Sequence, residues 1–199
     1  MKQKNYTKII LLISAILLCL ILLFYFMRVH NGVKVSPSME YPVTEPVIMY
    51  RQDDEKWAKD TLGESSYHMK GSGCLVSCIA AAVSNEGETI TPGELNALFS
   101  ENGVYDKEGN IQWGKISEME GYQVKVFNSP SNESIEQCLQ NGNYPIVRIR
   151  IHGIGNYHYV LVVGTKQGDY ICMDPLEDEL TTLSSYGKRV YTVRCVWKE

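Results

Sequence analysis

The hydrophobic pattern divides the chain into an apolar N-terminal run, a polar connecting segment and a longer mixed region. Residues 9–27 form a run of nineteen residues without a charge, and only Ser14 and Cys19 interrupt its large apolar side chains. A helix of this length extends about 28 Å, close to the hydrocarbon thickness of a bilayer. The pattern therefore predicts a transmembrane helix at residues 9–27 that contacts the lipid bilayer, after a short N-terminal segment at residues 1–8.

The flanking charges predict the orientation of this helix. Three lysines and the α-amino group precede the apolar run, whereas Arg28, His30 and Lys34 follow it. The side richer in fixed positive charge remains in the cytoplasm, so the C-terminal region should lie outside it. A cleavable signal peptide is the alternative, but its usual pair of small residues before the cleavage site is absent here. We therefore expect an uncleaved signal anchor in the cell membrane.

The rest of the chain is expected to form a linker and one domain. Residues 28–46 contain three prolines and little periodicity, which is typical of a linker. In the domain at residues 47–199, helical patterns come first, at 74–85, 91–102 and 113–120, and the second has a capping-box start at Thr91.

Strand patterns dominate after these helices. Alternating or continuous apolar segments occupy residues 122–127, 145–151, 157–164, 170–173 and 189–197, and a capped helix is expected at 131–140. Helices followed by an antiparallel-looking sheet indicate an α+β fold with two packed layers.

Charge and cysteine content narrow the possible functions. After position 30 the chain carries 15 Lys and Arg against 23 Asp and Glu, a formal charge of −8, which argues against nucleic-acid binding. The five cysteines in this part are odd in number and include no C-x-x-C pair, so at least one thiol is unpaired within the chain. His68, His152 and His158 show no metal-ligand spacing, and we expect neither a metal nor a cofactor.

One stretch carries a candidate nucleophile. Gly71 and Gly73 break the chain, Cys74 follows at once, and a run of small and apolar residues then continues to Ala82. A helix that begins at this break places Cys74 in its first turn, where free backbone N–H groups and the helix dipole favour a thiolate. A buried structural cysteine is the alternative interpretation.

Three further residues could complete a catalytic site around Cys74. His158 starts an apolar row in the strand YHYVLVVG, and Asp174 closes the next strand of the expected hairpin. Asp174 could therefore return to His158 and orient its imidazole toward the thiol. Gln52 is a candidate oxyanion donor, together with the backbone N–H of Cys74. Each residue also has a structural interpretation, as a core histidine, a turn aspartate before proline and a surface glutamine.

The order of these motifs resembles that of the C39-like peptidase family of papain-like cysteine peptidases. The resemblance spans about residues 47–197. It rests on Tyr50-x-Gln52-x-Asp54-x-x-Trp57, Gly73-Cys74-x-x-Ser77, Thr91-Pro92-x-Glu94-Leu95-Asn96, the strand HYVLVVG and Met173-Asp174-Pro175.

The resemblance implies a papain-like fold with N-terminal helices packed on an antiparallel sheet. It makes Cys74 the nucleophile, His158 the general base, Asp174 the orienting residue and Gln52 the oxyanion donor, in a hydrolase of peptide or cell-wall amides. The chain departs from relatives at Leu75-Val76, where they commonly carry smaller residues. Alternatives are a non-catalytic papain-like ectodomain that binds a peptide or wall component, and a redox module that uses Cys74 and Cys78.

Overall fold

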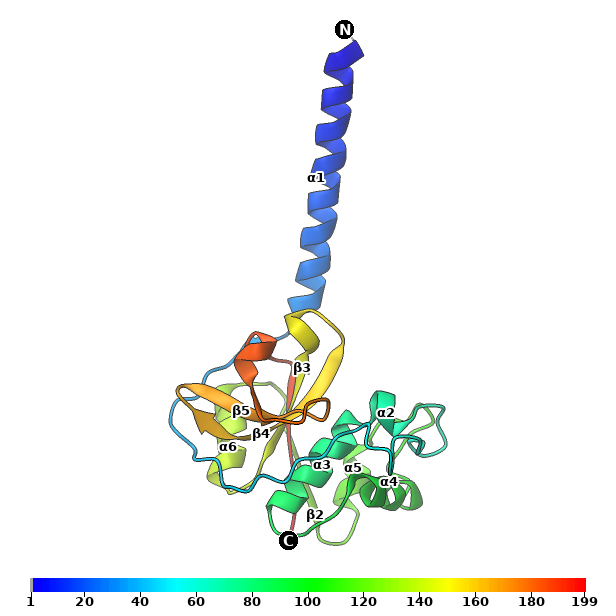
Figure 1. Ribbon diagram of the computed structural model, residues 1–199, viewed down its shortest axis with the longest axis vertical. Helices are drawn as coiled ribbons and strands as arrows, with labels where there is room; N and C mark the ends of the chain where they lie inside the picture. Colours follow the sequence, from blue (N-terminus) through cyan, green and yellow to red (C-terminus); the bar gives the residue numbers. More distant parts are fainter. Residues whose placement is uncertain (1) are drawn as a thin grey trace.

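A long apolar helix extends away from the folded part of the molecule. The computed structural model describes residues 2–199, and helix α1 occupies Lys2–Val29 (Figure 1). Its stretch Lys8–Val29 is long and apolar enough to cross a membrane, and its large side chains are exposed in the isolated chain. Length and composition of this kind are shared by membrane anchors and signal sequences.

The segment that follows α1 packs onto the domain. Strand β1 (Val33–Lys34) pairs with β7 (Arg189–Val190), and Val35 is only 2% exposed. Residues 28–46 are therefore not a free linker, because edge pairing and burial of Val35 fix them against the C-terminal part of the chain. The folded unit begins near Val33, whereas the sequence pattern placed its start at residue 47.

Four helices form one layer of the domain. They are α2 (Met69–Ser72), α3 (Cys74–Asn85), α4 (Pro92–Glu101) and α5 (Trp113–Ser117). The predicted start and end of α3 are confirmed, as is the capping box of α4, in which Thr91 and Glu94 exchange hydrogen bonds. The short helix α2 lies outside the predicted helices, and α5 is shorter than predicted.

The second layer is a six-stranded antiparallel sheet. Its strands are β2 (Tyr122–Val126), β3 (Pro145–Arg150), β4 (Tyr157–Lys166), β5 (Asp169–Met173), β6 (Thr181–Thr182) and β8 (Thr192–Lys198). The strand order is β2-β8-β3-β4-β5-β6. The predicted strand at 189–197 is two strands, since β7 pairs with β1 while β8 pairs with β2 and β3. The predicted hairpin between β4 and β5 is confirmed, with Gln167 and Gly168 at positive φ in the turn.

The sheet is buried on both faces. Ile146, Leu161 and Met173 pack with α3 in one apolar cluster, whereas Val147 and Val160 pack with Ile135 of α6 in another. Helix α6 occupies Asn132–Gln140, begins at the predicted cap Ser131, and is joined to β8 by a disulfide between Cys138 and Cys195. Two short 3-10 turns, η1 (Ile151–Gly153) and η2 (Leu183–Tyr186), complete the chain. The protein is a mixed α+β structure whose antiparallel sheet supports the N-terminus of α3.

Candidate active site

Cys74 is the first residue of α3 and lies at the junction of two helices. The N–H of Gly73 donates to the carbonyl of Met69 at 2.8 Å, so α2 runs directly into α3. Gly73 is the N-cap of α3 and offers no side-chain cap. Cys74 is a partly exposed free thiol, as a nucleophile must be. The backbone N–H groups of the first turn of α3 lie beside it.

The β4–β5 hairpin brings His158 and Asp174 together. His158 lies at the start of β4, and Asp174 follows the last residue of β5. The His158 Nε2 atom lies 2.6 Å from Asp174 Oδ1, and each residue is 3% exposed. Because Nε2 faces the carboxylate, Nδ1 is the ring nitrogen available to Cys74. The hairpin thus brings the expected histidine and carboxylate into contact.

The electrostatic environment favours a charged imidazole. Burial alone lowers the pKa of His158, but hydrogen bonds with Asp174 and Cys74, together with the charges of these two groups, raise it to about 9. For Asp174, burial raises the pKa, but the hydrogen bond from His158 and its charge hold it below the usual value. Near neutral pH His158 is therefore an imidazolium beside an ionised carboxylate.

Two further groups fix the Asp174 carboxylate. The backbone N–H of Leu176 donates to Oδ1 at 2.8 Å, and the hydroxyl of Tyr186 donates to Oδ2. Burial and the contact with Asp174 raise the pKa of Tyr186, which keeps it a hydrogen-bond donor. Tyr186 could not be predicted from the sequence, because it lies on the turn η2 and no local motif connects it to Asp174.

Gln52 lies between the two halves of the site. Its backbone N–H donates to the carbonyl of Pro175 at 2.9 Å, and its Nε2 donates to the carbonyl of Lys70 at 2.7 Å. Gln52 is 4% exposed, and among the described residues its Oε1 has no hydrogen-bond partner. Gln52 therefore connects the residue after Asp174 to the helix before Cys74, and it is not the surface glutamine of the alternative interpretation.

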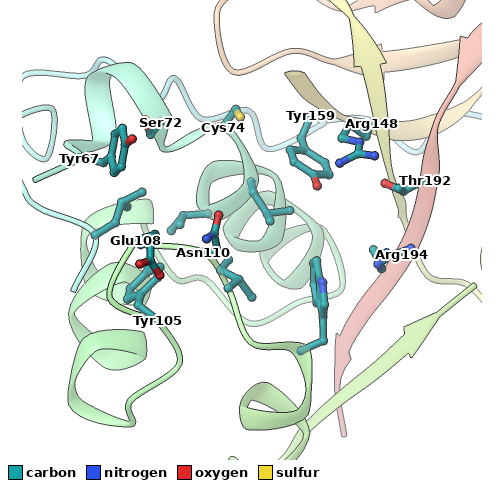
Figure 2. Close-up of a pocket in the computed structure, with 16 residues that line it drawn as sticks. Tyr67, Ser72, Cys74, Tyr105, Glu108, Asn110, Arg148, Tyr159, Thr192 and Arg194 are labelled. Carbon is teal, nitrogen blue, oxygen red and sulfur yellow. The ribbon is translucent and has the colours of Figure 1, made fainter. Parts of the chain in front are cut away.

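A cavity of about 610 Å³ extends from Cys74 between the helical layer and the sheet. Figure 2 shows Tyr67, Tyr105 and Glu108 on one side of this cleft and Tyr159 and Arg148 on the other.

Leu75 and Val76 also line this cleft, together with Trp113. These are the two positions at which relatives commonly carry smaller residues. The larger side chains at 75 and 76 therefore shape the space next to the candidate nucleophile.

The remaining thiols are separate from this arrangement. Cys74 and Cys78 are both free, so the disulfide required by the redox alternative is not formed. Burial raises the pKa of Cys78 and of Cys172 above that of an ordinary thiol, which makes both poor nucleophiles. Within residues 2–199 no group of three or more His, Cys, Asp or Glu side chains could hold a metal ion.

Comparison with solved structures shows a likeness of fold. No family model matches the chain, and no curated protein matches it either. A crystal structure of a putative C39-like peptidase from Bacillus anthracis superimposes with a TM-score of 0.51 at 12% identity, covering 81% of this chain and 99% of that chain. This likeness shows a shared fold and supports a papain-like architecture, in agreement with the resemblance found in the sequence.

Proposed function

We propose that this protein is a membrane-anchored cysteine peptidase that hydrolyses peptide or amide bonds outside the cytoplasm. The observation that carries the proposal is the buried His158–Asp174 contact of 2.6 Å, with the free thiol of Cys74 bordering a cavity at the start of α3. An imidazolium beside a thiol at a helix N-terminus stabilises a thiolate, which is the reactive form of cysteine. The fold shared with a C39-like peptidase supports the same activity.

The proposed reaction uses these groups in sequence. The Cys74 sulfur attacks the carbonyl carbon, and the carbonyl electron pair moves to oxygen. The backbone N–H of Cys74 and the second N–H of the Gln52 amide stabilise this oxyanion. His158 then donates its proton to the departing amine, which leaves an acyl-enzyme on Cys74. His158 next removes a proton from water, which attacks the thioester and releases the acid.

The proposed location rests on α1 and on the disulfide. Residues 9–27 would span the membrane, residues 1–8 would remain in the cytoplasm, and the domain would face the exterior. A structural disulfide such as Cys138–Cys195 persists in an oxidising compartment, which supports this orientation.

Alkylation of the full-length protein in detergent micelles tests the proposed site. Iodoacetamide labelling of each cysteine would be followed by mass spectrometry between pH 5 and 9. We expect Cys74 at pH 6 to react at least about tenfold faster than Cys78 and Cys172. His158→Ala should remove this advantage, whereas His152→Asn, at an exposed histidine, should not.

Slow labelling of Cys74, at a rate that does not change in His158→Ala, would contradict catalysis and favour the non-catalytic binding module. Cleavage of a peptide mixture by the wild type, lost in Cys74→Ala, is the corresponding test of activity. The anchor is tested separately, by N-terminal sequencing of the protein extracted from membranes: retention of residues 1–27 is the expected result.

A further inference from the structure

Two arginines from neighbouring strands line the Cys74 cleft. Arg148 lies on β3 and Arg194 on β8, and both border the cavity together with Thr192. In the sheet register Arg148 is opposite Thr192 on one side and Tyr159 on the other, so these side chains share one face. Figure 2 shows Arg148, Thr192 and Arg194 along the same side of the cleft. Arg148 therefore lies beside Tyr159 of β4, and Arg194 lies on the far side of β3 from that strand.

Neither arginine has an acidic partner. Among residues 2–199, no carboxylate forms an ion pair with Arg148 or Arg194. Arg194 Nη1 donates to the carbonyl of Val193 at 2.7 Å, and the Arg148 guanidinium lies 4.3 Å from the centre of the Tyr157 ring. The acidic side chain that lines the cavity is Glu108, which is exposed and stands on the opposite wall (Figure 2).

Polar atoms at this wall are also buried without partners. They are Arg148 Nε, Arg194 Nε and Thr192 Oγ1. Burial lowers the pKa of Arg194, which reflects the partial loss of water around its charge. Desolvated donors of this kind cost free energy unless an acceptor satisfies them. Acidic residues outnumber basic ones in the chain, yet within residues 2–199 none forms an ion pair with these two arginines.

We propose that Arg148, Arg194 and Thr192 form a subsite for a carboxylate of the substrate. The proposal rests on the proposed peptidase function and names its substrate class: peptides with an acidic group near the bond attacked by Cys74. Guanidinium groups bind carboxylates through paired, charge-assisted hydrogen bonds, and the Thr192 hydroxyl adds a further donor. The aromatic rings of Tyr159 and Trp113 provide apolar contact for the rest of the peptide.

The carboxylate can come from a Glu side chain or from a free C-terminus, and three peptides separate these sources. They are acetyl-Ala-Glu-Ala-amide, acetyl-Ala-Gln-Ala with a free carboxylate, and the neutral acetyl-Ala-Gln-Ala-amide. Full-length Cys74→Ala protein in detergent would be treated with phenylglyoxal, which modifies arginine, in the presence of each peptide. We expect one or both carboxylate peptides to slow modification of Arg148 and Arg194 about fivefold or more, and the neutral peptide to have little effect. Equal protection by all three peptides, or by none, would overturn the proposal.

A second measurement uses the reactive thiol in the otherwise native protein. Iodoacetate carries a carboxylate where iodoacetamide carries a neutral amide. The rate of Cys74 alkylation by iodoacetate divided by the rate with iodoacetamide therefore measures how strongly the site attracts an anion. Arg148→Gln with Arg194→Gln should lower this ratio about tenfold, and the ratio cancels any change in the reactivity of the thiol itself. The double change to Lys should restore much of it, and Lys166→Gln, which removes an exposed charge elsewhere, should not alter it. A ratio unchanged in the double Gln variant counts against the subsite.

The two proposals fail in different ways. Protection of the arginines in Cys74→Ala does not depend on thiol chemistry. If the carboxylate peptides protect Arg148 and Arg194 but Cys74 proves unreactive, the anion subsite stands and the peptidase function fails. If Cys74 is reactive but no peptide protects the arginines, the peptidase function stands and the anion subsite fails.

Discussion

His158 Nε2 lies 2.6 Å from Asp174 Oδ1, and this contact joins the first residues of β4 to the residue that follows β5. Both side chains are buried, so the pair exists in a region of low dielectric, where such contacts are strong. The contact leaves Nδ1 for Cys74. The chemistry proposed for this protein depends on it.

Asp174→Asn should weaken the site through His158. Without the carboxylate, the pKa of His158 falls from about 9, and less of the side chain is imidazolium near neutral pH. We expect peptide cleavage, or iodoacetamide labelling of Cys74 at pH 6–7, to fall by about a hundredfold or more. Tyr186→Phe removes a single hydrogen bond to Asp174 and should have a smaller effect. Equal losses in the two variants would contradict the assignment of Asp174 as the main partner of His158.

The same pair predicts how stability depends on pH. The pKa of His158 is raised from 6.5 in the unfolded chain to about 9, so its contribution is complete below pH 6.5 and is lost as pH rises through 9. Urea unfolding between pH 6 and 10 should show this loss in the wild type. The free energy of unfolding should depend less on pH in His158→Gln, because a glutamine side chain does not titrate.

Glu86 should also favour its protonated form, which for a carboxyl group is the neutral one. It is the C-cap of α3, and burial raises its pKa from 4.5 to about 7, only partly offset by the nearby backbone amides of Tyr144 and Lys198. A raised acidic pKa means that its protonated form favours folding, so stability falls as pH rises from 4.5 through 7.

Glu86→Gln should therefore stabilise the protein at pH 8 by about 1–2 kcal/mol, after allowance for partial solvent exposure. The variant should have little effect at pH 4.5. Thermal unfolding at these two pH values measures the difference, and equal shifts at both would rule out the titration of Glu86 as the cause.

Two glycines before the nucleophile should respond differently to substitution. A Cβ on Gly73 would lie 2.6 Å from the Met69 carbonyl oxygen, whereas one on Gly71 would meet nothing within 4 Å. Gly73→Ala must separate α2 from α3 and should cost about 1–3 kcal/mol of stability. It should also slow Cys74 labelling, because the first turn of α3 moves. Gly71→Ala is the matched control, and similar effects at both positions would contradict the packing argument.

The disulfide should stabilise the C-terminal half of the domain. Cys138 and Cys195 are 57 residues apart in the sequence and connect α6 to β8. Cys138→Ala with Cys195→Ala should lower the free energy of unfolding by about 2–4 kcal/mol. Cys172→Ala, at a free buried thiol, is the comparison that separates loss of the crosslink from loss of a buried sulfur. Denaturant unfolding under oxidising conditions provides the measurement.

Local signals predicted the elements that carry the candidate catalytic groups. The capping boxes at Thr91 and Ser131 specify helix starts through contacts within a few residues, and Gly73 marks the start of α3 without a side-chain cap. The turn of the β4–β5 hairpin is likewise a local signal, because Gln167 and Gly168 connect the two strands directly. The return of Asp174 to His158 could therefore be predicted.

Groups that depend on distant chain segments could not be predicted in this way. Tyr186 reaches Asp174 from η2, and Val35 is buried because β1 pairs with a strand more than 150 residues away. Arg148 lies in the predicted strand at 145–151, in which apolar and polar residues alternate. Only the register with β8 brings Arg194 and Thr192 to the same wall as Arg148.

The sequence by itself determined the apolar N-terminal helix, the α+β order and the residue types of the candidate site, because these depend on periodicity, caps and turns over short distances. Tertiary structure alone decided the shape and charge of the cleft, the partners of Gln52 and the packing of residues 28–46. These depend on side chains that meet across layers, and no spacing along the chain encodes which unpaired cations will face the same cavity.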